Sequence, residues 1–193
     1  MNKQKYKSPL HRMTQETPTC LWNDSASVSE LEYAIDNGAV GATCNPVIAL
    51  NVAKQDMDYW RDRILAMISE MSPATEDEIS WRLVEEVSKR GAELLLPIFE
   101  RHKGKNGRLA IQTDPRYYRD ADAIVRQALE FSKLMPNMIV KIPVTDAGIT
   151  AIEEATAEGV SVLATVCFTV PQCLAVAEAV ERGLKRRQEA GKD

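Results

Sequence analysis

Lys141 lies in the middle of an apolar segment, residues 137–145, that is short enough to be a buried strand. An ammonium on such a strand must find polar partners or lose its proton, because desolvation disfavours the charged form. A neutral lysine is a nucleophile toward carbonyl carbons and forms Schiff bases. The alternation of strand side chains puts Lys141 on the face opposite to Val140 and Ile142. The ordinary alternative is a lysine at a sheet edge that extends its amine to solvent.

Four other strand-like segments also end in polar residues. Because the carboxyl ends of barrel strands meet at one mouth, these side chains would surround one small cavity with Lys141. The lysine would attack a ketone, an aspartate would move protons at the hydroxyl where a carbon–carbon bond breaks, a glutamine and a threonine would hold a water, and an asparagine would bind substrate hydroxyls. The residues are Asp24, Asn45 with Thr43 on the same face, Gln112 and Thr165.

Each of these polar residues also has an ordinary structural explanation. Asp24 is placed to cap the first helix, and Asn45 to shape the turn before Pro46. Gln112 fits a hydrogen-bonded core amide, and Thr165 is a common strand residue. Taken singly, these explanations are the better ones. The shared placement of all five side chains favours a single site.

The elements that would carry this site alternate between strand and helix patterns. Pro46 suits the first position of a helix, and Thr75 with Glu78 forms a capping-box pattern. Pro97 is expected to kink its helix or end it early. Strands are predicted at 19–24, 40–45, 108–113, 137–145 and 160–168, and helices at 28–37, 57–71, 75–102, 120–134, 147–157 and 171–187.

Strands that alternate with helices predict a parallel sheet built of right-handed βαβ units. A doubly wound nucleotide-binding fold is disfavoured, because residues 24–27 hold no glycine-rich turn after the first strand. We expect an α/β fold of the (β/α)8 TIM-barrel type, of which the sequence supplies the first five β/α units. Residues 1–18 are expected to be a polar tail and residues 19–193 a single barrel domain, truncated after the fifth strand and its helix.

Composition limits the range of functions. The 193 residues carry a net charge of -4, and this charge with the sequence pI near 5.4 gives no general attraction to nucleic acid or anionic membrane. No stretch approaches the roughly 20 apolar residues of a membrane span, and residues 1–18 contain no signal-like apolar segment. The cysteines lack metal-ligand spacing, so no metal is expected, and we interpret them as reduced, buried thiols of a cytoplasmic protein. They are Cys20, Cys44, Cys167 and Cys173.

Five motifs resemble, in order and spacing, those of the transaldolase family. The resemblance implies a (β/α)8 barrel that transfers a dihydroxyacetone unit between sugar phosphates in the pentose phosphate pathway, through a lysine Schiff base and without metal or organic cofactor. It also implies that Lys141 is the Schiff-base lysine, Asp24 the acid/base, Asn45 a substrate ligand and Thr165 the threonine near the catalytic water. The motifs are Trp22-Asn23-Asp24-Ser25, Ala42-Thr43-Cys44-Asn45-Pro46, Ile111-Gln112-Thr113-Asp114-Pro115-Arg116, Ile139-Val140-Lys141-Ile142-Pro143 and Thr165-Val166-Cys167-Phe168-Thr169-Val170-Pro171-Gln172.

The sequence departs from this family in three places. Gln112 replaces the usual catalytic glutamate, as in relatives that act as fructose-6-phosphate aldolases, and an amide positions water but takes no proton. Leu163 replaces an asparagine two residues before the threonine. The last three strands, with the arginine and serine that hold the substrate phosphate in the family, are absent from this sequence.

These departures leave three functions open. The first is transaldolase-like transfer, and the second is aldolase-like cleavage of fructose 6-phosphate. The third is an inactive interaction module whose open sheet edges pair with another copy or a separate chain. The expected partners are therefore a sugar phosphate and, through the open edges, a second copy of the chain.

Overall fold

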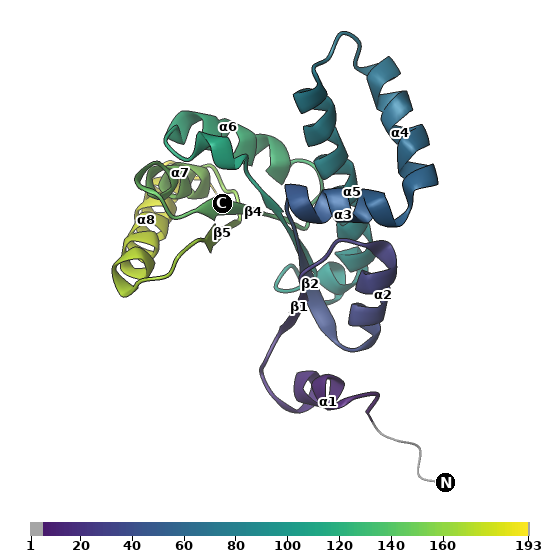
Figure 1. The fold of residues 1–193 in the computed structure, drawn as a ribbon. Helices are drawn as coiled ribbons and strands as arrows, with labels where there is room; N and C mark the ends of the chain where they lie inside the picture. The colour runs from purple at the N-terminus through teal and green to yellow at the C-terminus, as the bar shows by residue number, and fades with distance from the viewer. Residues whose placement is uncertain (1–5, 193) are drawn as a thin grey trace. The chain divides into compact units, whose positions relative to one another are not determined.

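The computed structural model describes residues 6–192 as an α/β chain (Figure 1). The chain divides into two compact units, residues 1–109 and 110–193, which we call the amino-terminal and carboxy-terminal units. Strand β3 (Arg108–Gln112) begins in the first unit and continues into the second.

Five strands form one sheet in the same order as they follow one another along the chain. The strands are parallel, so each one is followed by helical structure and then by a strand beside it, as in successive units of a β/α barrel. The predicted fold class, the first five β/α units of a barrel, is confirmed. In addition to β3, the strands are β1 (Leu21–Asn23), β2 (Ala39–Cys44), β4 (Met138–Pro143) and β5 (Val162–Thr165).

Helices pack against β2 in the amino-terminal unit. Ala42 and Cys44 of this strand are fully buried, and α2 and α5 contact it. The long helix α5 packs closely against the first residues of β3. A Cβ atom added to Gly91 would lie 2.8 Å from the Leu109 side chain. The helices are α1 (Pro9–Glu16), α2 (Val28–Asp36), α3 (Pro46–Gln55), α4 (Met57–Glu70) and α5 (Glu76–Arg101).

In the carboxy-terminal unit, helices α7 and α8 pack closely together. Gly183 of α8 makes this possible, since a Cβ atom there would lie 2.6 Å from the carbonyl oxygen of Glu153. Ion pairs from Arg182 and Arg186 to Glu153 border the same contact. The helical elements of this unit are the 3₁₀ turn η1 (Pro115–Tyr117), α6 (Ala121–Ser132), α7 (Asp146–Ala157) and α8 (Val170–Glu189).

Two features of the amino-terminal unit refine the sequence-based expectations. Pro97 lies inside α5, which continues to Arg101, so the proline does not end the helix early. The segment expected to be a polar tail contains α1, with Ser8 accepting a hydrogen bond from the His11 N–H as its cap. The predicted capping box of Thr75 and Glu78 is confirmed at the start of α5.

Candidate active site

Asp24 and Thr43 are hydrogen-bonded at the carboxyl ends of β1 and β2. The Thr43 hydroxyl donates to Oδ1 of Asp24. This contact follows from the register of the two strands, in which Asn23 pairs with Ala42, so that the next two residues lie side by side. Asp24 does not cap α2, since Ser27 is the residue at that position. The ordinary explanation for Asp24 is therefore wrong.

Asn45 follows β2 and caps α3. Its Oδ1 accepts a hydrogen bond from the Ile48 N–H at 2.8 Å, and Pro46 begins the helix as predicted. The ordinary explanation for Asn45, a role in shaping this turn, is confirmed. Because the cap uses the oxygen, the side-chain NH₂ group is the part of Asn45 that can donate to another molecule.

Lys141 lies in β4 on the face opposite to the fully buried Val140 and Ile142, as the alternation predicted. Helices α6 and α7 contact this strand. Val140 and Ile142 are buried because they lie on the face that these helices cover. The Lys141 side chain is half-buried. Within the described part of the carboxy-terminal unit, no side chain hydrogen-bonds or ion-pairs with its amine.

Thr165 lies on the same face of the sheet as Lys141. In the parallel register of β4 and β5, Lys141 pairs with Leu163, and Pro143 pairs with Thr165. Paired residues point to the same face, and so do residues two apart along one strand. The leucine that replaces the expected asparagine is therefore the direct neighbour of the lysine.

Gln112 completes this row from the other side of Lys141. The backbone N–H of Thr113 donates to the Lys141 carbonyl oxygen at 3.1 Å. In a parallel pair, a residue donates to the carbonyl that precedes its register partner, so Thr113 pairs with Ile142 and Gln112 pairs with Lys141. Among residues 110–192, no group hydrogen-bonds to the Gln112 side-chain amide, which rules out a satisfied core amide within this unit.

Gln172 is a functional candidate that sequence reasoning missed. Its Nε2 donates to the carbonyl oxygens of Val144 at 3.2 Å and Val166 at 3.1 Å, and its Oε1 accepts from the N–H groups of Phe168 and Thr169. One side chain thus fixes the turn that follows β5 and connects it to the end of β4. The capping pattern of Thr169 and Gln172 was the available sequence signal, since Thr169 is the N-cap and Gln172 the third residue of α8.

The turn after β5 also contains a strained residue. Val166 has a φ angle of +56°, in the left-handed region that β-branched residues rarely adopt. Such conformations persist where surrounding contacts hold them, and they cluster at functional sites. Here the Gln172 amide supplies such a contact at the Val166 carbonyl.

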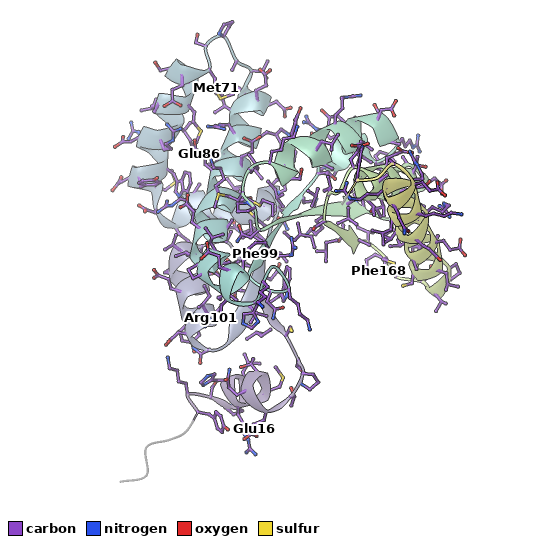
Figure 2. The ribbon with its side chains drawn as sticks, turned by 180° about the vertical axis from the view of Figure 1, so that it is seen from behind. Glu16, Met71, Glu86, Phe99, Arg101 and Phe168 are labelled. Carbon is purple, nitrogen blue, oxygen red and sulfur yellow. The ribbon has the colours of Figure 1, made fainter. Side chains whose placement is uncertain are left out.

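The same turn exposes apolar side chains. The exposed fraction is 84% for Phe168 and 71% for Val170, and Figure 2 shows Phe168 beside the helix α8. Val166 and Leu174 are also exposed. We call these four residues the β5 turn patch.

The cysteines differ from the expectation of buried thiols. Cys44 is buried, but Cys20 and Cys173 are exposed, and Cys167 is half-buried. The expectation is therefore wrong for Cys20 and Cys173. All four are free thiols. Among residues 6–192, no three His, Cys, Asp or Glu side chains are grouped as metal ligands.

Comparison with known proteins identifies the family of this chain and several relatives. Residues 21–190 match the family Transaldolase/Fructose-6-phosphate aldolase, and the chain belongs to that family. It is 32% identical over 181 residues to a transaldolase of Kocuria rhizophila, covering 90% of this chain and 48% of the relative. It is also 32% identical over 195 residues to a transaldolase of Thermobifida fusca, covering 96% of this chain and 52% of the relative. The chain thus spans about half the length of the curated relatives that it matches.

No helix among the described residues is long and apolar enough to span a membrane.

Proposed function

We propose that this chain carries the covalent machinery of a transaldolase-type transferase. It would move a dihydroxyacetone unit between sugar phosphates of the pentose phosphate pathway, through a Schiff base on Lys141. Membership of the family supports this proposal. The observation that carries it is the row on one face of the carboxy-terminal unit, where Gln112 and Leu163 flank Lys141 and Thr165 lies one position further along.

The chemistry assigns one role to each residue. Nζ of Lys141 attacks the ketone carbon of the donor, and the adduct loses water to give an iminium ion. Asp24 accepts the proton of the hydroxyl group beside the bond that breaks, and an aldehyde leaves while an enamine stays on the lysine. The enamine then adds to an acceptor aldehyde, and water releases the product. Gln112 and Thr165 hold that water, while Asn45 and Thr43 bind the substrate.

Two observations fit these roles. The hydrogen bond from Thr43 leaves Oδ2 of Asp24 for a proton while holding Oδ1 in place. The cap of α3 occupies the Asn45 oxygen and leaves its NH₂ group to donate to substrate hydroxyls.

Borohydride trapping tests the covalent step. The protein is incubated with fructose 6-phosphate and reduced, and the modified peptide is located by mass spectrometry. We expect an adduct on Lys141 that is absent from Lys141→Arg. Lys133→Arg is the matched control, because Lys133 is exposed just before β4 and should leave the adduct unchanged. An adduct on another lysine, or none in folded protein, would refute the assignment.

Aldolase-like cleavage of fructose 6-phosphate is the second candidate, favoured by the glutamine at position 112. The two reactions differ in what happens to the three-carbon unit. Transfer requires an acceptor such as erythrose 4-phosphate and releases no free dihydroxyacetone, whereas cleavage releases it without an acceptor. Product analysis with and without erythrose 4-phosphate therefore separates them.

The β5 turn patch favours a third candidate, an interaction module that lacks activity. This candidate predicts no adduct on Lys141 and an apparent mass that rises with concentration in size-exclusion chromatography. Replacing Phe168 by serine would reduce that rise. A monomer at every concentration would exclude assembly through a second copy of the chain.

A further inference from the structure

Cys167 and Cys173 form a close pair of thiols in the carboxy-terminal unit. Their sulfur atoms lie 3.4 Å apart. Cys167 belongs to the turn after β5, and Cys173 to the first turn of α8. Neither thiol has a role in the proposed reaction, so the pair requires its own explanation.

The backbone of the turn brings these sulfurs together. Val166 turns the chain through its left-handed conformation, and Thr169 then begins α8 as its N-cap. The Gln172 side chain accepts hydrogen bonds from the N–H groups of Phe168 and Thr169, at 3.0 and 3.1 Å. The two cysteines therefore lie on either side of a turn that its own hydrogen bonds hold in place.

The two thiols differ in their surroundings. Cys173 is exposed and Cys167 is half-buried. A hydrogen bond to Cys173 raises the pKa of the Cys167 thiol, and burial adds to this rise. Cys173 is thus the thiol that is more accessible to a dissolved oxidant, and Cys167 is its less exposed neighbour.

We propose that Cys167 and Cys173 are a reversible oxidation site, at which a peroxide converts the pair to an intramolecular disulfide. The Cys173 thiolate attacks one peroxide oxygen, the O–O bond breaks, and water leaves after taking up a proton; Cys173 becomes a sulfenic acid. The Cys167 sulfur then attacks the Cys173 sulfur, the S–O bond breaks, and a second water leaves with the Cys167 proton. The two thiols are oxidised by two electrons, and the peroxide is reduced. The sulfurs must approach from 3.4 Å to about 2.05 Å.

The proposal does not depend on the proposed reaction at Lys141. It concerns thiols that react whether or not a sugar phosphate binds. A failure of borohydride trapping would leave it intact, and a failure of oxidation would leave the Schiff-base proposal intact.

The test treats the full chain with hydrogen peroxide and locates the product by chymotryptic digestion. Cleavage after Phe168 separates the two cysteines, so a disulfide appears as two fragments that dithiothreitol releases. We expect that linkage, with two of the four thiols of the chain lost to titration under denaturing conditions. Cys20→Ser is the matched control, because Cys20 is exposed in the other unit and its loss should leave the linkage unchanged.

Two variants examine the order of the steps. Cys167→Ser should stop at a sulfenic acid on Cys173 that dimedone traps, and Cys173→Ser should lose the linkage without gaining a rapid adduct on Cys167. Phenylarsine oxide, which bridges two adjacent thiols, should bind the unmutated chain with one equivalent and bind neither variant tightly. Circular dichroism verifies that the variants are folded. Absence of the linkage in unmutated protein, or a linkage that involves Cys20 or a second chain instead, would overturn the proposal.

Discussion

The side-chain amide of Gln172 donates a hydrogen bond to the carbonyl oxygen of Val144, at 3.2 Å. Val144 directly follows β4, and Gln172 lies in the first turn of α8. The contact therefore connects the ends of the strands that carry Lys141 and Thr165. The Gln172 side chain thus adds to the pairing of β4 and β5 in connecting the strands that carry two candidate catalytic residues.

Replacing Gln172 by alanine should lower the free energy of unfolding by about 1–3 kcal/mol, because two backbone carbonyls and two N–H groups lose their partner. Urea denaturation followed by circular dichroism measures the loss. Gln188→Ala is the control on the same helix, where the side chain is exposed, and it should change stability by less than about 0.5 kcal/mol. Equal effects of the two substitutions would show that the amide contacts contribute nothing.

Val166→Gly should raise the free energy of unfolding by up to about 1 kcal/mol. Glycine removes the steric cost of the left-handed conformation, roughly 1–2 kcal/mol, and part of the gain is lost to the greater freedom of the unfolded chain. The same substitution at Val180, inside α8, should destabilise the protein by roughly 1 kcal/mol or more. Thermal melts of both variants measure whether each substitution raises or lowers the stability of the protein. A loss of stability at position 166 would mean that packing of the valine outweighs its strain.

Gly183→Ala should destabilise the packing of α7 against α8 by about 1–3 kcal/mol, because the added methyl group meets the Glu153 carbonyl and the Thr156 side chain. Alanine is the better helix former, so helix propensity alone predicts the opposite sign. Chemical denaturation decides between them. An increase in stability would contradict the close approach of the two helices.

Acid should weaken the start of α5 through Glu78. The hydrogen bond from the Thr75 N–H lowers the pKa of the Glu78 carboxyl group, with the Thr75 hydroxyl adding to it. A lowered pKa in the folded state contributes stability above the unfolded pKa, about 4.3, and loses it as the pH falls through the folded value. Glu78→Gln should therefore lower the melting temperature at pH 7, and its difference from the unmutated protein should shrink below pH 4. For Glu93→Gln, an exposed control on the same helix, we expect a smaller difference at pH 7.

Leu163→Asn should speed adduct formation on Lys141 by about 2–10-fold, which corresponds to one additional hydrogen bond to the substrate. The reason is the register, which makes residue 163 the direct neighbour of the lysine. Leu163→Ala removes the same apolar group without adding a donor and should give no such gain. The rate of borohydride-trapped product measures both variants. Equal rates would show that position 163 does not contact the substrate.

The order and type of the elements after α1 could largely be predicted from the sequence, because local signals agreed with the tertiary structure. The Thr75 and Glu78 pattern and Pro46 are local signals, and both begin helices as expected. The helix does not end early at Pro97, because a proline weakens a helix locally, whereas packing of a 26-residue helix can outweigh that cost. The fifth strand was predicted too long, since its apolar pattern continues past the point where Val166 turns the chain.

The candidate site was predictable only in part. Alternation along one strand was sufficient to place Lys141 on the face opposite to Val140 and Ile142. Its neighbours on that face depend on the register between strands, which is set by pairing of distant segments and leaves no local mark. The contact of Gln172 with Val144 was missed for the same reason, although the capping pattern of Thr169 and Gln172 marked the turn itself.

Because side chains alternate strictly along β4, the number of residues before Lys141 in this strand matters more than the identity of those residues. Inserting one residue between Met138 and Lys141 would turn the amine to the helix-covered side, where Val140 and Ile142 now lie. Inserting two would return it to its original side, displaced along the strand by about 7 Å. Substitutions at this strand therefore have graded effects, whereas an insertion of an odd number of residues reverses the direction of the nucleophile.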